Sequence, residues 1–202
     1  MNIQPYAGFW KRAFAFMIDA LVLLIPNFVI QFLITKFAFH NLETTADPIQ
    51  QMTAVFGGFF LTGVAVTILQ WIYCAWLESS KYQATLGKMA LGIKVVNEKG
   101  ERISFGRATG RFFAKIISYF TFYFGCFMAG FTTYRQALHD IIASTFVVSK
   151  ESQPGETFPQ YPFNTLFCVL SAFTSLLILI VPIFGILVAT ILPVLLSTPT
   201  AQ

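Results

Sequence analysis

The stretch "GFWKRAFAFMIDALVLLIP", residues 8–26, joins a basic pair to a long apolar run that contains one carboxylate. Lys11 and Arg12 lead into the run, and Asp19 interrupts it. An ionisable side chain inside a bilayer costs about 2.5–3.5 kcal/mol on insertion scales unless it is paired or hydrated. The sequence therefore predicts that something compensates Asp19: a cation, a hydrogen-bond donor on another helix, or a bound proton.

The composition around this run is that of a membrane protein. Charged residues make up 11% of the 202-residue chain, against about 25% in soluble domains, and hydrophobic residues make up 56%. A bilayer core about 30 Å thick needs about 20 helical residues. Three stretches fit one span each, namely residues 13–35, 54–77 and 112–131. A fourth, 163–197, is too long for one span and is divided by Pro182 and Pro193.

We therefore predict an all-α membrane protein, a helical transmembrane bundle of three to five hydrophobic segments. Residues 1–150 form its membrane domain, and "ESQPGETFPQYP", residues 151–162, has the proline-rich composition of a linker. Residues 163–202 form a C-terminal hydrophobic segment that either crosses once or turns back.

The distribution of basic residues predicts the orientation. Lys11 and Arg12 precede the first span and seven basic residues lie between positions 78 and 111, whereas the loop at 36–53 has one lysine and two acidic residues. The positive-inside rule then places the N-terminus and residues 78–111 in the cytoplasm. The net charge of +4 comes mostly from these cytoplasmic basic residues. They form no basic stripe interleaved with aromatic residues, the pattern typical of nucleic-acid binding. We expect membrane lipids as partners, and no nucleic acid.

A small cytoplasmic β-hairpin element is predicted within the basic loop. In "LGIKVVNEKGERIS", residues 91–104, the β-branched run favours a strand, "NEKG" favours a turn and "ERIS" is the expected return strand. A second β-prone run, "STFVVSK", lies at 144–150. It can join the same sheet only if residues 112–138 form a re-entrant hairpin, broken near Gly125 or Gly130, rather than a full crossing. Both alternatives stay open.

Three sets of polar residues could carry chemistry. Arg12 and Asp19 lie about two helical turns apart on roughly one face. The segment "YRQALHDIIAS", residues 134–144, offers a cation, an imidazole and a carboxylate, and four-residue spacing places pairs of them on a shared face. The predicted ion-binding or structural cluster comprises Arg12, Asp19, Arg135, His139 and Asp140, and the secondary polar set comprises Glu78 and Lys88.

Four ordered pieces give the chain a family likeness: "KRAFAFMIDAL", "ESSKYQATLGKMALGIKVV", "ISFGRATGRFFAK" and "FTTYRQALHDIIASTFVV". Over about residues 5–150 the sequence resembles the RDD family of bacterial membrane proteins, named for an arginine and two aspartates. By position these are Arg12, Asp19 and Asp140. The resemblance implies a multi-pass protein of the bacterial inner membrane, and some members have been linked to sodium–proton exchange.

Two functions follow from these observations. In the first, Asp19 and Asp140 bind Na⁺ alternately with protons, and Arg12 adjusts their pKa values. In the second, the protein is a non-catalytic, membrane-anchored accessory or scaffold protein whose Arg-Asp-Asp cluster is structural and whose basic loop binds lipid headgroups or a partner. We expect no enzyme activity, cofactor or metal site, and we expect a homo-oligomer or a membrane partner protein.

Overall fold

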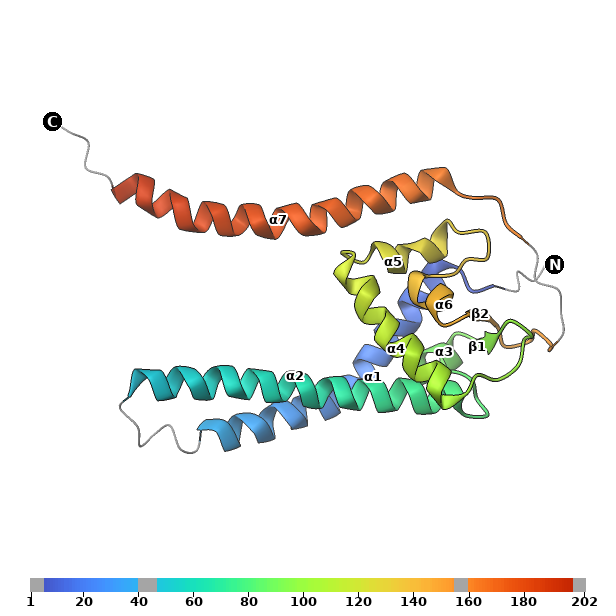
Figure 1. Cartoon of the computed structure of the whole chain (residues 1–202), viewed down its shortest axis with the longest axis horizontal. Coiled ribbons are helices and arrows are strands. Elements are labelled where there is room, and N and C mark those ends of the chain that lie inside the picture. The colour runs from blue at the N-terminus through green and yellow to red at the C-terminus, as the bar shows by residue number, and fades with distance from the viewer. Residues whose placement is uncertain (1–5, 40–46, 155–159, 198–202) are drawn as a thin grey trace.

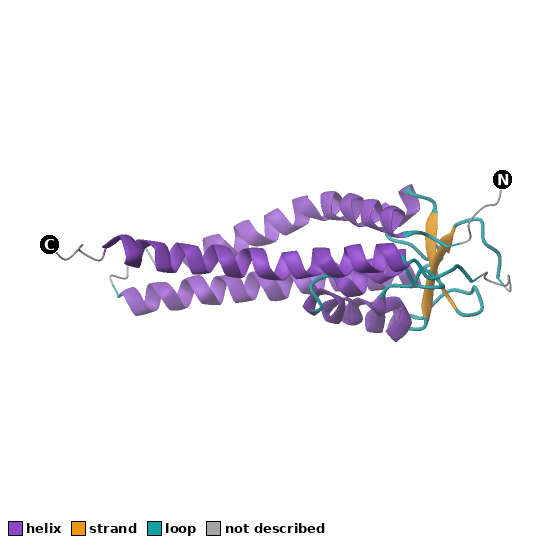
Figure 2. Ribbon diagram, turned by 90° about the horizontal axis from the view of Figure 1, so that it is seen from above, coloured by secondary structure: helices purple, strands orange, loops and turns teal. Residues whose placement is uncertain are grey.

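The computed structural model describes residues 6–39, 47–154 and 160–197 and is mostly helical. The long helices extend away from a small sheet at one end of the molecule (Figures 1 and 2). The elements in chain order are α1 (Phe9–Phe39), α2 (Pro48–Ser79), α3 (Leu86–Ala90), β1 (Ile93–Asn97), α4 (Phe105–Phe120), α5 (Phe124–Phe127), the 3₁₀ helix η1 (Met128–Gly130), α6 (Leu138–Ile142), β2 (Thr145–Ser149) and α7 (Thr165–Ser197).

Helices α1 and α2 form an antiparallel pair and contain the first two predicted spans (Figure 1). Asp47 begins α2, because its carboxylate accepts a hydrogen bond from Ile49 N at 2.9 Å and Pro48 occupies the first helical position. Three segments of the described chain are long and apolar enough to span a membrane: Phe9–Phe37, Pro48–Ser79 and Thr165–Pro182. Their large apolar side chains are mostly exposed, as a lipid-facing surface requires.

Helix α7 is continuous from Thr165 to Ser197, so the expected division at Pro182 and Pro193 is wrong for the backbone. A proline removes one backbone donor and crowds the preceding turn. In a long apolar helix the neighbouring hydrogen bonds keep the segment helical, which is why spans tolerate proline. The start of α7 packs against α5 and η1, on the side of the molecule away from α2 (Figure 1).

The third predicted span is two helical pieces bent sharply against each other. Helix α4 begins at Phe105 and ends at Phe120, and the path through α5 and η1 turns by 116°. The break lies at Phe122 and Tyr123, whose φ angles are +49° and +64°, two residues before Gly125, one of the two glycines near which it was expected. These positive φ angles reverse the chain direction at a cost that the surrounding packing must offset.

The sheet has two antiparallel strands, and its second strand is the predicted β-prone run at 144–150. The return strand expected at "ERIS" was wrong. β1 pairs with β2, with Val95 opposite Val147, and the "ERIS" segment forms no strand. The "NEKG" turn does form: the side chain of Asn97 accepts hydrogen bonds from the amides of Lys99 and Glu101. Beyond it, Ser104 accepts a hydrogen bond from Arg107 N at 3.2 Å and begins α4, so the chain becomes helical before it can pair.

Each face of the sheet is covered. Val95 and Val147 join a core of small and branched residues from the helices, and Val96 and Val148 pack beneath Tyr6. Pairing of β1 with β2 means that the chain between them leaves the sheet and returns to it. This is the geometry of the re-entrant alternative.

We predict that residues flanking β1 and β2 lie on one side of the membrane. In a background with Cys74, Cys126 and Cys168 replaced by serine, a membrane-impermeant maleimide should label Glu101→Cys and Glu151→Cys from the same side. It should label Asp47→Cys from the opposite side. Labelling of Glu101→Cys and Glu151→Cys from opposite sides would contradict the pairing.

Candidate functional site

Asp140 is the centre of a buried charge cluster. It lies on α6, its side chain is 0% exposed, and it forms ion pairs with Arg12 of α1 and Arg111 of α4. Arg111 donates from Nε at 2.8 Å and from Nη2 at 2.6 Å to the same carboxylate oxygen. Ala137 N donates to the other oxygen at 3.2 Å, which caps α6. One carboxylate therefore ties three helices together.

A second carboxylate extends the cluster to α2 and α3. Glu78, at the end of α2, accepts hydrogen bonds from Arg111 Nη1 at 2.8 Å to each of its oxygens. Lys88 of α3 forms an ion pair with the same carboxylate. The connected order is Arg12, Asp140, Arg111, Glu78 and Lys88, which joins helices α1, α6, α4, α2 and α3.

Helix α4 delivers Arg111 to the interior on a face of small residues. Ala108, Arg111, Ala114 and Ser118 recur every three or four positions and are all buried. The small neighbours let α4 approach α2, where Thr109 accepts a hydrogen bond from the Trp71 indole at 3.1 Å. Arg111 is then 2% exposed, and both edges of its guanidinium reach a carboxylate.

Asp19 lies in a separate polar site between α1, α2 and α3. Its carboxylate accepts hydrogen bonds from Tyr73 Oη at 2.7 Å, Thr85 Oγ1 at 2.6 Å and Gly87 N at 2.7 Å. Thr85 is the N-cap residue of α3, and Asp19 supplies the capping acceptor that the Thr85 side chain does not. The partners of Asp19 are thus hydrogen-bond donors on other elements, one of the three compensations that the sequence predicts.

Gly87 allows this contact because it has no side chain. A Cβ at this position would collide with the carbonyl oxygen of Ala15 and come within 3.0 Å of Asp19 Cγ. The "TLGK" sequence therefore packs the first turn of α3 directly onto α1. Lys88, the next residue, is directed to Glu78.

His139 is buried beside the cluster and is not one of its charged links. Its Nδ1 lies 3.3 Å from Ser118 Oγ, and its Nε2 lies 3.6 Å from Asp140 Oδ1. Burial lowers the pKa of His139 well below its ordinary value, against the opposing attraction of Asp140. The imidazole is therefore neutral at physiological pH.

Charge and burial also act on Asp140 and Lys88. Burial disfavours the Asp140 carboxylate, but Arg111 and Arg12 outweigh burial and hold the pKa of Asp140 well below its usual range. Burial lowers the pKa of Lys88 to about 8, although Glu78 favours the charged form. At neutral pH the five linked side chains thus comprise three cations and two carboxylates.

The structure brings together only part of the predicted set. Arg12 and Asp140 meet as expected, and Glu78 and Lys88 join them, whereas Asp19 has its own three donors. Arg135 contributes its backbone carbonyl, which accepts from Arg12 Nη2 at 2.6 Å, and its guanidinium does not pair with Asp140.

Arg111 is the residue that sequence reasoning missed. It lies immediately before the predicted span 112–131, and its sequence position suggested only one of the seven basic residues of the cytoplasmic loop. The available signal was its place in a stripe of alanine and serine at helical spacing. Within the described residues, no group of three histidine, cysteine or acidic side chains is arranged to hold a metal ion.

Removing Arg111 should destabilise the fold strongly. Arg111→Met leaves Glu78 and Asp140 buried with less positive charge, and loss of one partner from a buried ion pair costs about 3–5 kcal/mol. Arg107→Met is the matched control, because Arg107 lies one turn earlier on α4 and is exposed. Thermal unfolding in detergent should show a large fall in Tm for the first variant and little change for the second. Equal Tm values would refute the role given to Arg111.

Comparison with known proteins supports the likeness seen in the sequence. The sequence model of the RDD family matches residues 6–144, which include every residue of the charge cluster and leave α7 outside. No solved structure matches the chain.

Two proteins of Bacillus subtilis (strain 168) are similar to the chain. "Uncharacterized protein YxaI" is 40% identical over 156 residues, covering 73% of this chain and 100% of its own length. "Uncharacterized membrane protein YteJ" is 30% identical over 156 residues, covering 73% of this chain and 84% of its own. With a match across most of its length and three apolar helices, this membrane protein belongs to the RDD family.

Proposed function

We propose that this protein is a non-catalytic, membrane-anchored accessory or scaffold protein, and that its Arg-Asp-Asp residues are structural. It would reside in a bacterial plasma membrane with its N-terminus and its sheet in the cytoplasm. The orientation follows from the positive-inside rule, since α3 and β1, which carry Lys88 and Lys94, lie at the same end of the molecule in Figure 1.

The proposal rests on the hydrogen-bond and ion-pair partners that surround the carboxylates of Asp19, Asp140 and Glu78. Asp19 accepts three hydrogen bonds from uncharged groups, and Asp140 and Glu78 each receive at least three contacts from cations or amides. A sodium ion needs several oxygen ligands free of such donors. Around Asp140 and Glu78 it would also meet Arg12, Arg111 and Lys88, which repel it.

Exposed polar side chains on the spans make hydrogen bonds within their own helices. Gln31 donates to Thr35 at 3.0 Å and Thr67 donates to the Gly63 carbonyl at 2.7 Å, and all of these contacts are exposed ones within a single helix. Such groups satisfy each other on a lipid-facing helix surface.

A scaffold with this surface would act in an assembly, as a homo-oligomer or with another membrane protein. Helix α2 carries Gly57 and Gly63, and a Cβ added at either would meet no atom within 4 Å. An exposed glycine lets a second helix approach closely at that position, and these two lie on different sides of α2. Together with the basic, sheet-bearing end, these open positions give the protein surfaces for a membrane partner and for lipid headgroups.

A flux measurement distinguishes this proposal from cation exchange. Wild-type protein reconstituted into liposomes with an internal pH-sensitive dye should move no protons above empty liposomes when a Na⁺ gradient is imposed. Asp19→Asn should behave identically in flux and should lower Tm, because an amide cannot accept all three hydrogen bonds in the same geometry.

Glu101→Gln serves as the control for reconstitution, since Glu101 is exposed and lies outside the cluster. Sodium-driven proton movement in the wild type and in Glu101→Gln, but not in a stably folded Asp19→Asn, would overturn the proposal. It would then make Asp19 a coupling site for Na⁺ and H⁺.

A further inference from the structure

A basic groove lies where α1 and α7 begin. Two adjoining cavities of about 330 Å³ and 640 Å³ share Gly130, Arg135 and Asn164 as lining residues. Among the residues that the structure describes, neither lining contains an aspartate or a glutamate, and the larger one adds Lys11. This described part of the groove therefore presents two cations and no carboxylate, outside the charge cluster described above.

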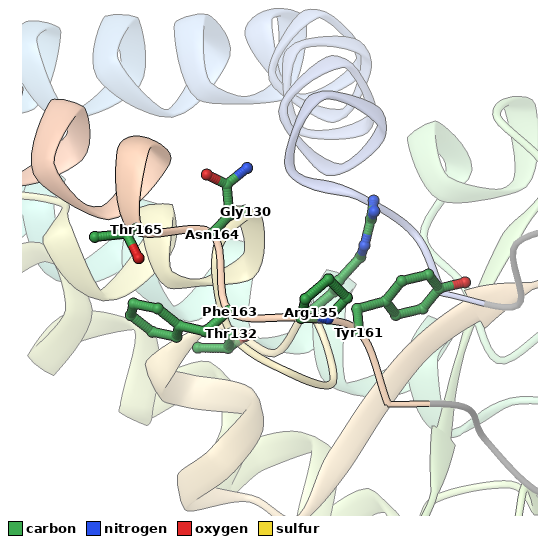
Figure 3. Close-up of a pocket in the computed structure, with 8 residues that line it drawn as sticks. Gly130, Thr132, Arg135, Tyr161, Phe163, Asn164 and Thr165 are labelled. Atoms are coloured by element: carbon green, nitrogen blue, oxygen red, sulfur yellow. The ribbon is translucent and has the colours of Figure 1, made fainter.

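Arg135 is held in this groove by its backbone. Its φ is +50°, its amide donates to Thr132 O at 3.0 Å, and its carbonyl accepts from Arg12. The guanidinium stacks on Tyr161, with Cζ 4.7 Å from the ring centroid. Figure 3 shows the Arg135 side chain beside Tyr161, extended toward the segment that leads into α1. Backbone hydrogen bonds and stacking of the guanidinium thus both fix the position of Arg135.

The hydrogen-bonding edge of this guanidinium is unused within the described residues. None of its N–H groups has a hydrogen-bond acceptor or an ion-pair partner there, although a guanidinium carries five donors. Gly8 lies against it, since a Cβ at that position would come within 2.9 Å of Arg135 Nη1. Stacking on a ring leaves the edge of the fork open, and that fork matches the oxygens of a phosphate.

The surroundings of the groove place it at a membrane surface. Trp10, which is 66% exposed, and Phe167 line the larger cavity at the first turns of α1 and α7. Tryptophan is enriched at the level of lipid headgroups. A ligand whose phosphate meets Arg135 and Lys11 would thus have its apolar part beside the two helices as they enter the bilayer.

We propose that this groove binds the phosphodiester of an anionic phospholipid. Arg135 holds the phosphate oxygens, Lys11 adds positive charge, and the acyl chains lie along α1 and α7. This inference does not rest on the proposed scaffold role, because the groove shares no side chain with the charge cluster.

Binding can be measured on the full chain in a neutral maltoside detergent. Short-chain phosphatidylglycerol is titrated while intrinsic tryptophan fluorescence is followed. The wild type should bind saturably, Arg135→Gln about tenfold more weakly, and Arg107→Gln, which removes an exposed arginine elsewhere, as tightly as the wild type. If Arg135→Gln does not fold, Lys11→Gln replaces it, since Lys11 is exposed and has no ion pair in the described part of the chain.

Two further titrations identify the ligand. Phosphatidylcholine of the same chain length should bind at least tenfold more weakly than phosphatidylglycerol, and inorganic phosphate should not displace the lipid at equal concentration. Equal binding of the two lipids would overturn the proposal, as would unchanged affinity in both groove variants. Displacement by inorganic phosphate would show a site for a free anion and would overturn the lipid assignment.

Discussion

The guanidinium of Arg111 between two buried carboxylates is the interaction on which the architecture depends. Glu78 lies near the end of a membrane span and Asp140 lies on the short helix α6, which leads back into the sheet. Neither carboxylate could be buried alone, because an unpaired charge in a dry interior is costly. Arg12 and Lys88 complete the pairing at the two ends. The cluster thus fixes where α1, α2 and the bent segment from α4 to α6 meet.

Asp19 shows a different solution to the same problem. It lies in the apolar run that opens α1, yet its partners are a phenol, a hydroxyl and a backbone amide instead of a cation. The amide belongs to Gly87, so the carboxylate also caps a helix that would otherwise begin without an acceptor. An aspartate near the membrane therefore positions α3, and through Lys88 it helps to bring a cation to Glu78.

The sequence predicted the helical class and the first two spans, because apolar length is a local signal. The meeting of Arg12 with Asp140, which lie 128 positions apart, was expected from the family resemblance and not from a local pattern. It predicted both strands as β-prone runs, at 93–96 and 144–150, but assigned "ERIS" as the return strand of a hairpin. That assignment was wrong because turn chemistry at "NEKG" does not say whether the following residues pair or begin a helix. Ser104 caps α4, so the residues after the turn begin a helix instead of a strand. Arg111 escaped notice because its partners lie 33 and 29 positions away. Such distant pairings depend on how α4 packs, which no local pattern contains.

We propose that the family's arginine and second aspartate, Arg12 and Asp140, act as one structural unit. The direct test is a double-mutant cycle on Arg12 and Asp140, measuring the free energy of unfolding of the wild type, Arg12→Gln, Asp140→Asn and the double variant in mixed micelles. The structure predicts that each single variant is destabilised and that the double variant loses about 1–3 kcal/mol less than the sum of the two. Losses that add within about 0.5 kcal/mol would contradict the claim.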